Sequence, residues 1–183
     1  MEIPAIDLLA IFSAFTVGVV SKYLDDLQDF RKAFIAMLIA TVPAAIFAYV
    51  APEMFLGIVA GVYIAGKIDT KILSFYFIYL VAIMMVVDVL FDIKLRLLPL
   101  LVFTFAAAYD EKEIRLFGIE RLFLPLSALM FIVGGLLMEW INISVGALDA
   151  QTLFNVGFRS LVYLIAFDIG YRITAWLIDT PEQ

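Results

Sequence analysis

The chain has 183 residues, of which 65% are hydrophobic and 16% are charged, and its mean hydropathy is +1.08. These values exclude an ordinary soluble globular domain, in which about a quarter of the residues are charged. The sequence contains neither cysteine nor histidine, which excludes disulfides, thiol nucleophiles and zinc or haem sites built on those residues. A net charge of −6 argues against nucleic acid as a partner.

Seven apolar segments follow one another and predict an all-α integral membrane protein with about seven transmembrane helices. A span of the bilayer takes about 20 residues, and the length indicates a single polytopic membrane domain over residues 1–183. The third and fifth segments are short, so an alternative fold has five crossings and two re-entrant segments. The segments are approximately 4–21, 33–50, 53–67, 72–91, 97–109, 122–141 and 152–178.

Basic residues predict which ends of the segments lie inside the cell. With seven crossings and the N-terminus outside, the inner loops hold eight Lys and Arg residues, whereas the outer loops hold only Lys94 and Arg96. Five crossings give the same ratio, because those two residues exchange sides with Lys67 and Lys71. We expect seven crossings of the cell membrane, with the C-terminus inside, since polar residues mark both ends of the third segment.

The tightest group of charges is Asp25-Asp26-x-x-Asp29, at the end of the first segment. Three carboxylates this close repel one another unless a cation neutralises them. Mg²⁺ is usually held by one or two carboxylates together with substrate phosphate oxygens. This aspartate triplet therefore predicts a magnesium site, with Asp25 and Asp26 also acting in catalysis and with Lys22 and Arg31 on the phosphate. A solvated loop with balanced charges is the alternative.

Aspartates also end the third and fifth segments, at Asp69 and Asp110, and we interpret this recurrence as a common way to end a helix at the membrane surface. Asp110 lies on the inner side in either topology and is a further candidate metal ligand. Lys67, two residues before Asp69, is a further candidate phosphate contact. The charged segment 109–121 predicts an amphipathic helix on the membrane surface.

Asp88 and Asp92 share one helical face near the end of the fourth segment. With seven crossings, Asp88 lies roughly 25 Å from the inner surface and cannot join the triplet. With five crossings, both acidic motifs are inside and could form one metal site. The topology therefore decides whether this second acidic motif takes part.

Asp168 is the most deeply placed acid, and Arg172 follows one helical turn later. Acids inside a membrane usually pair, so the spacing predicts a neutralised ion pair. The functional alternative makes Asp168 a catalytic residue that shapes the same cavity as the inner acids. In a separate pattern, Gly57 and Gly61 lie four residues apart and predict close packing against another helix.

The aspartate triplet resembles the DDxxD motif of polyprenyl-diphosphate enzymes, and its combination with a second acidic motif resembles the UbiA-type membrane prenyltransferases. In that family, two acidic motifs hold Mg²⁺ on the substrate diphosphate, and the helices shield an allylic cation from water. The resemblance implies a membrane transferase of isoprenoid metabolism. This chain is far shorter than that family, and its first motif lacks the usual Asn. Its second motif would be either Asp88 with Asp92, or Asp110 with Gly118 and Leu124-Pro125.

Three functions are consistent with these residues. The first is a magnesium-dependent membrane enzyme that acts on a polyprenyl or other lipid (di)phosphate at the cytoplasmic face. The second is a cation- or proton-coupled transporter or channel that uses intramembrane aspartates. Two short segments end in Asp69 and Asp110, Asp168 lies within a span, and short broken segments are where transporters bind ions. The third is a non-catalytic membrane subunit. The expected partners are the lipid bilayer and a lipid or isoprenoid phosphate, and a homo-oligomer is a further option.

Overall fold

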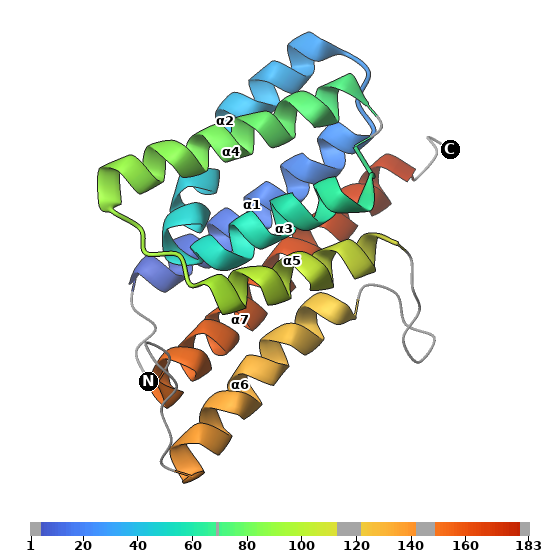
Figure 1. The fold of residues 1–183 in the computed structure, drawn as a ribbon. Coiled ribbons are helices and arrows are strands. Elements are labelled where there is room, and N and C mark those ends of the chain that lie inside the picture. The colour runs from blue at the N-terminus through green and yellow to red at the C-terminus, as the bar shows by residue number, and fades with distance from the viewer. Residues whose placement is uncertain (1–4, 69, 113–121, 142–148, 180–183) are drawn as a thin grey trace. The chain divides into compact units, whose positions relative to one another are not determined.

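The computed structural model describes residues 5–68, 70–112, 122–141 and 149–179. These residues form seven α-helices and no strand, which confirms the predicted all-α fold. Five helices, α1, α2, α4, α6 and α7, are long and apolar enough to cross a membrane, so the chain is a multi-span integral membrane protein. The helices are α1 (Ala5–Asp25), α2 (Phe30–Val50), α3 (Pro52–Ala65), α4 (Lys71–Phe91), α5 (Leu97–Glu111), α6 (Phe123–Ile141) and α7 (Ala150–Asp179) (Figure 1).

The two short helices are those that the sequence indicated. Helix α3 has 14 residues and α5 has 15, which corresponds to roughly 21–23 Å of helix. Only Ala51 separates α2 from α3, and Pro52 is the first residue of α3. Proline suits this position because its missing N–H would have no partner inside the helix.

Polar side chains begin three of the long helices. Asp29 Oδ1 accepts a hydrogen bond from the amide of Arg31 at 2.9 Å, at the start of α2. Thr70 Oγ1 accepts one from the amide of Leu73 at 3.1 Å, at the start of α4. Asp149 caps α7 in the same way. Such caps satisfy amide groups that have no partner within the helix, so part of the acidic pattern in the sequence is explained by helix capping.

The chain divides into two compact units. The first unit contains Met1–Pro52, Ile68–Lys94 and Tyr163–Gln183, and the second contains Glu53–Lys67 and Leu95–Val162. Helix α7 contributes its C-terminal part to the first unit and its N-terminal part to the second.

In the first unit, α2 packs against both α1 and α4. Helices α2 and α4 lie side by side and run in the same direction (Figure 1). Near their first residues, the rings of Phe30 and Phe75 are 5.4 Å apart, and near their last residues those of Tyr49 and Phe91 are 4.8 Å apart. Small side chains allow α1 and α2 to approach closely. The fully buried alanines of these two helices are Ala10, Ala14, Ala33, Ala40, Ala44 and Ala48.

The parallel arrangement of α2 and α4 bears directly on the topology. If α3 were re-entrant, α2 and α4 would be consecutive crossings and would run in opposite directions. Because they run in the same direction, the end of α2 and the start of α4 lie about one length of α2, or 30 Å, apart. Residues 51–70 connect these two points and must therefore cover that distance. Helix α3 and the residues that follow it are long enough for this return. The helix directions therefore favour seven crossings over five.

In the second unit, α3 and α5 also run in the same direction. A Cβ added at Gly57 would lie 2.7 Å from the Cβ of Phe103, and one added at Gly61 would lie 2.5 Å from the Cβ of Ala107. This contact confirms the predicted role of the two glycines in close helix packing.

Helices α5 and α6 form an antiparallel pair in the second unit. The rings of Tyr109 and Phe123 are 5.4 Å apart at one end, and those of Phe103 and Phe131 are 5.4 Å apart farther along. The N-terminal part of α7 packs against α6. A Cβ added at Gly135 of α6 would lie 2.7 Å from the carbonyl oxygen of Ala150, so the two backbones are close at this point.

Candidate metal and phosphate site

Helices α1 and α7 cross at a reciprocal glycine contact in the first unit. A Cβ added at Gly18 would lie 2.2 Å from the carbonyl oxygen of Phe167, and one added at Gly170 would lie 2.3 Å from that of Phe15. These distances show that the two backbones are in contact, which leaves no room for a side chain at either glycine. This crossing fixes the last turn of α1 against the turn of α7 that carries Tyr171.

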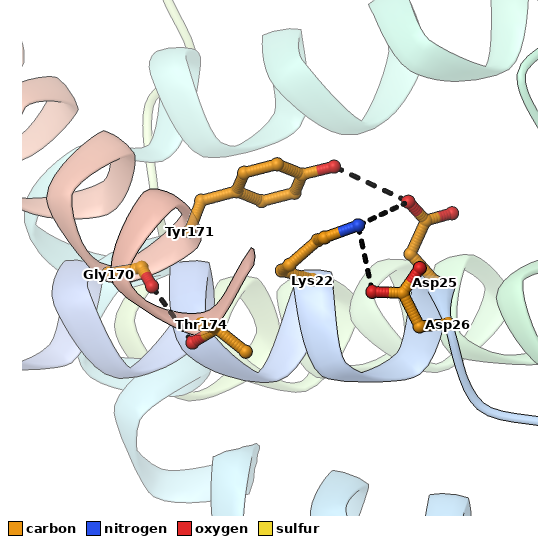
Figure 2. A network of polar contacts seen from close by, with 6 residues as sticks. All are labelled: Lys22, Asp25, Asp26, Gly170, Tyr171 and Thr174. Carbon is orange, nitrogen blue, oxygen red and sulfur yellow. Dashed lines mark hydrogen bonds and ion pairs between the residues drawn. The ribbon is translucent and has the colours of Figure 1, made fainter. Parts of the chain in front are cut away.

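Lys22 is the centre of the charge cluster beyond this crossing. Its Nζ lies 2.8 Å from Oδ2 of Asp26 and 3.9 Å from Oδ2 of Asp25. It also lies 5.8 Å from the centre of the Tyr171 ring, and the Tyr171 hydroxyl donates a hydrogen bond to Asp25 Oδ2 at 3.4 Å. Figure 2 shows the ammonium group between the two carboxylates and the tyrosine ring. We call these four residues, Lys22, Asp25, Asp26 and Tyr171, the Lys22 cluster.

The exposure of the cluster suits a ligand that comes from the membrane surface. The Lys22 side chain is only 14% exposed, whereas those of Asp25 and Asp26 are 39% and 35% exposed. The two carboxylates and the ammonium carry a net charge of −1, which attracts a cation. Carboxylate oxygens are the ligands that Mg²⁺ prefers in proteins.

Asp29, the third member of the triplet, is engaged separately. Its carboxylate caps α2, while Asp25 and Asp26 contact Lys22. Within the part of the chain that the structure describes, no three acidic side chains are grouped so that they could hold a metal ion. The triplet is therefore divided into a pair of carboxylates and a cap. The exposed side chain of Arg31 lies at the start of α2, two residues after Asp29.

The second acidic motif lies at the other end of α4. Tyr76 is near the start of α4, and its hydroxyl forms a 3.2 Å hydrogen bond with that of Ser21, next to Lys22. Asp88 lies about 18 Å farther along α4 at 1.5 Å per residue, and Asp92 follows as the C-terminal cap, with a left-handed φ of 49°. Both are exposed. The structure does not bring them together with the triplet.

Asp168 and Arg172 form the ion pair that their spacing predicted. Arg172 Nε donates to Asp168 Oδ2 at 2.6 Å. Asp168 thus has a charged partner on its own helix. Lys67, a candidate phosphate contact, is exposed after the end of α3 and belongs to the second unit.

Asp110 is engaged by a helix rather than by other acids. It is 4% exposed, and it accepts hydrogen bonds from the amides of Phe123 at 2.7 Å and Leu124 at 2.9 Å. Each carboxylate oxygen accepts one of the two bonds, so Asp110 caps the start of α6 from the end of α5. The candidate Asp69, and residues 113–121 of the expected amphipathic segment with its Gly118, lie outside the described residues.

Two polar contacts have no signature in the sequence. Glu53 is buried at the start of α3, and its Oε1 accepts hydrogen bonds from the Nε of Arg96 at 2.6 Å and from the Arg96 amide at 3.3 Å. Tyr163, also buried, donates to Asp7 Oδ1 at 3.0 Å. The partners are 43 and 156 residues apart, so no local spacing could have predicted them.

Comparison of the chain with protein-family models, with curated proteins and with solved structures finds no match. The geometry of the Lys22 cluster is therefore the main basis on which a function can be proposed.

Proposed function

We propose that the protein is a magnesium-dependent membrane enzyme that acts on a lipid (di)phosphate, with an isoprenoid phosphate as the preferred substrate class. The observation that carries the proposal is the pair of half-exposed carboxylates, Asp25 and Asp26, held around Lys22 at the end of a membrane span. A hydrophobic lipid tail would remain in the bilayer beside the apolar helices, while its phosphate reaches this pair. The similarity of the triplet to the DDxxD motif supports the same substrate class.

Charge balance gives each residue of the cluster a role. Asp25 and Asp26 would supply the protein's oxygen ligands to Mg²⁺, and substrate phosphate oxygens would complete the coordination. The ammonium of Lys22, no longer needed to neutralise both carboxylates, would turn to the phosphate, and Arg31 would assist at the start of α2. When bound, Mg²⁺ would neutralise the phosphate and stabilise a departing (di)phosphate.

Other candidate residues take different places in this proposal. Asp29 and Asp110 begin helices, so we assign them to positioning rather than to the metal. Asp168 receives no chemical role, because Arg172 neutralises it. The transporter alternative rests in part on Asp168, and that part is weakened for the same reason. The excess of basic residues in alternate loops supports an orientation with the N-terminus outside and the Lys22 cluster on the cytoplasmic side.

The experiment is a Mn²⁺ titration of the purified protein in nanodiscs, in which free Mn²⁺ is measured by its electron paramagnetic resonance signal. It is performed with and without an isoprenyl diphosphate. We expect tight binding only when both are present, and a loss of at least about tenfold in affinity, or ~1.4 kcal/mol, in Asp25→Asn/Asp26→Asn. The matched control is Asp88→Asn/Asp92→Asn, another exposed aspartate pair, at the far end of α4. Equal Mn²⁺ binding by both double variants would contradict the proposal and favour a non-catalytic subunit.

A further inference from the structure

Helix α7 carries an ion pair on a face that the rest of the described chain leaves open. The Asp168 and Arg172 side chains are 41% and 68% exposed, although they belong to a candidate membrane span. Ile165, Ile169 and Trp176 are exposed on the same helical face. The opposite face of α7 contacts α1 through Gly170, so the charged face points away from that contact.

The direction of the arginine side chain makes this exposure significant. Trp176 is suited to the membrane–water interface, and Asp168 lies two helical turns, about 12 Å, deeper along α7. Arg172 reaches back toward Asp168 rather than outward to the interface. Charged side chains within spans almost always face protein or a water-filled cavity, because hydrocarbon solvates them poorly. A protein partner of matching charge would remove this exposure.

We infer that this face of α7 binds the same face of a second copy of the chain. Around a two-fold axis normal to the membrane, each residue of α7 is level with the same residue of the other copy, and Arg172 of the other copy is one turn, about 6 Å, from Asp168 along the axis. Because the Arg172 side chain reaches back to the level of Asp168, its guanidinium can lie near the carboxylates of both copies. The face is then self-complementary in charge, because the guanidinium of each copy, already paired with its own Asp168, lies at the depth of the other copy's carboxylate. The exposed positions 165, 169, 172 and 176 follow the alternating four- and three-residue spacing by which parallel helices interlock, and Asp168 lies beside position 169.

The first test uses the absence of cysteine from the chain. Ile169→Cys and Trp176→Cys are oxidised separately in native membranes, together with Val89→Cys, a strongly exposed apolar position of α4, as the collision control. We expect a disulfide-linked dimer of the chain at positions 169 and 176 and none at 89. Absence of the dimer at both α7 positions, an equal yield at position 89, or cross-linking to a different protein would overturn the inference.

A second test separates pairing between copies from pairing within one chain. Asp168→Arg and Arg172→Asp, each combined with Ile169→Cys and a different tag, give chains that carry two like charges. We expect each variant alone to lose the cross-link and the two together to form mixed dimers. Mixing cannot restore an ion pair within one chain, so failure to recover mixed dimers overturns the role of the ion pair. If either charge variant fails to accumulate in the membrane, the yields at positions 169, 176 and 89 decide the inference alone.

Discussion

Removal of the Asp110 carboxylate should destabilise the junction of α5 and α6. The carboxylate accepts two amide hydrogen bonds, at 2.7 and 2.9 Å, from the first turn of α6. A hydrogen bond to a charged group contributes about 1.5–3 kcal/mol, and loss of a helix cap costs about 0.5–2 kcal/mol. We therefore expect Asp110→Ala to lower the free energy of unfolding by about 3 kcal/mol, since both amides lose their acceptor. Asp110→Asn keeps one acceptor oxygen and should lose about 1 kcal/mol.

The assay for this prediction is reversible unfolding of the purified protein in mixed micelles, at several Mg²⁺ concentrations. Asp88→Ala, at an exposed position, is the control and should unfold like the unmodified chain. A loss below about 0.5 kcal/mol in Asp110→Ala, which is the size of an ordinary surface substitution, would refute the capping role. A loss that grows with Mg²⁺ concentration would instead indicate that Asp110 is a metal ligand.

Three further predictions follow from other contacts. Gly18→Ala should lower the free energy of unfolding by about 1–3 kcal/mol in the same micelle assay, because its Cβ would lie 2.2 Å from a carbonyl oxygen of α7; an unchanged value would contradict the close crossing. Arg96→Met should lower the free energy of unfolding more than the double variant Arg96→Met/Glu53→Leu does, because the single change leaves a buried carboxylate without its charged partner. A larger loss in the double variant would contradict the buried pair. Hydrogen bonds from Thr152 lower the pKa of Asp149 below 3.8. This cap therefore stabilises α7 above about pH 4, and the stabilisation is lost as the pH falls through the folded-state pKa. The thermal unfolding temperature of Asp149→Asn should therefore depend less on pH in this acid range than that of the unmodified chain.

Local patterns in the sequence predicted the helices and the contacts formed along one helix. Apolar runs marked all seven helices, including the short α3 and α5, because hydrophobic length is a local property. The spacing of Asp168 and Arg172 predicted their ion pair for the same reason. The glycines of α3 were assigned to helix packing without knowledge of which helix would contact them.

The remaining features depend on contacts between distant residues. The sequence makes Asp110 a candidate metal ligand, and in the structure its oxygens accept hydrogen bonds from the amides of a helix that begins 13 residues later. The partnership of Glu53 with Arg96 requires α3 and α5 to lie side by side, which no pattern in either segment indicates. The ratio of basic residues inside to basic residues outside is the same in the two topologies, because a charge count does not depend on which helices are neighbours. The parallel contact of α2 with α4 supplies that information.

The most direct test of seven crossings, which decide whether Asp88 and Asp92 share a membrane surface with the Lys22 cluster, is the sidedness of the two ends of α4. Gln28→Cys reports the end that carries the cluster, and Lys94→Cys reports the end that carries Asp88 and Asp92; both positions are exposed. Each variant is labelled in sealed membrane vesicles with a membrane-impermeant thiol reagent, added first to the outside and, in a second sample, after permeabilisation. We expect the two cysteines to be labelled from opposite sides of the membrane. Labelling of both from the same side would contradict the seven-crossing topology and would place the two acidic motifs on one surface.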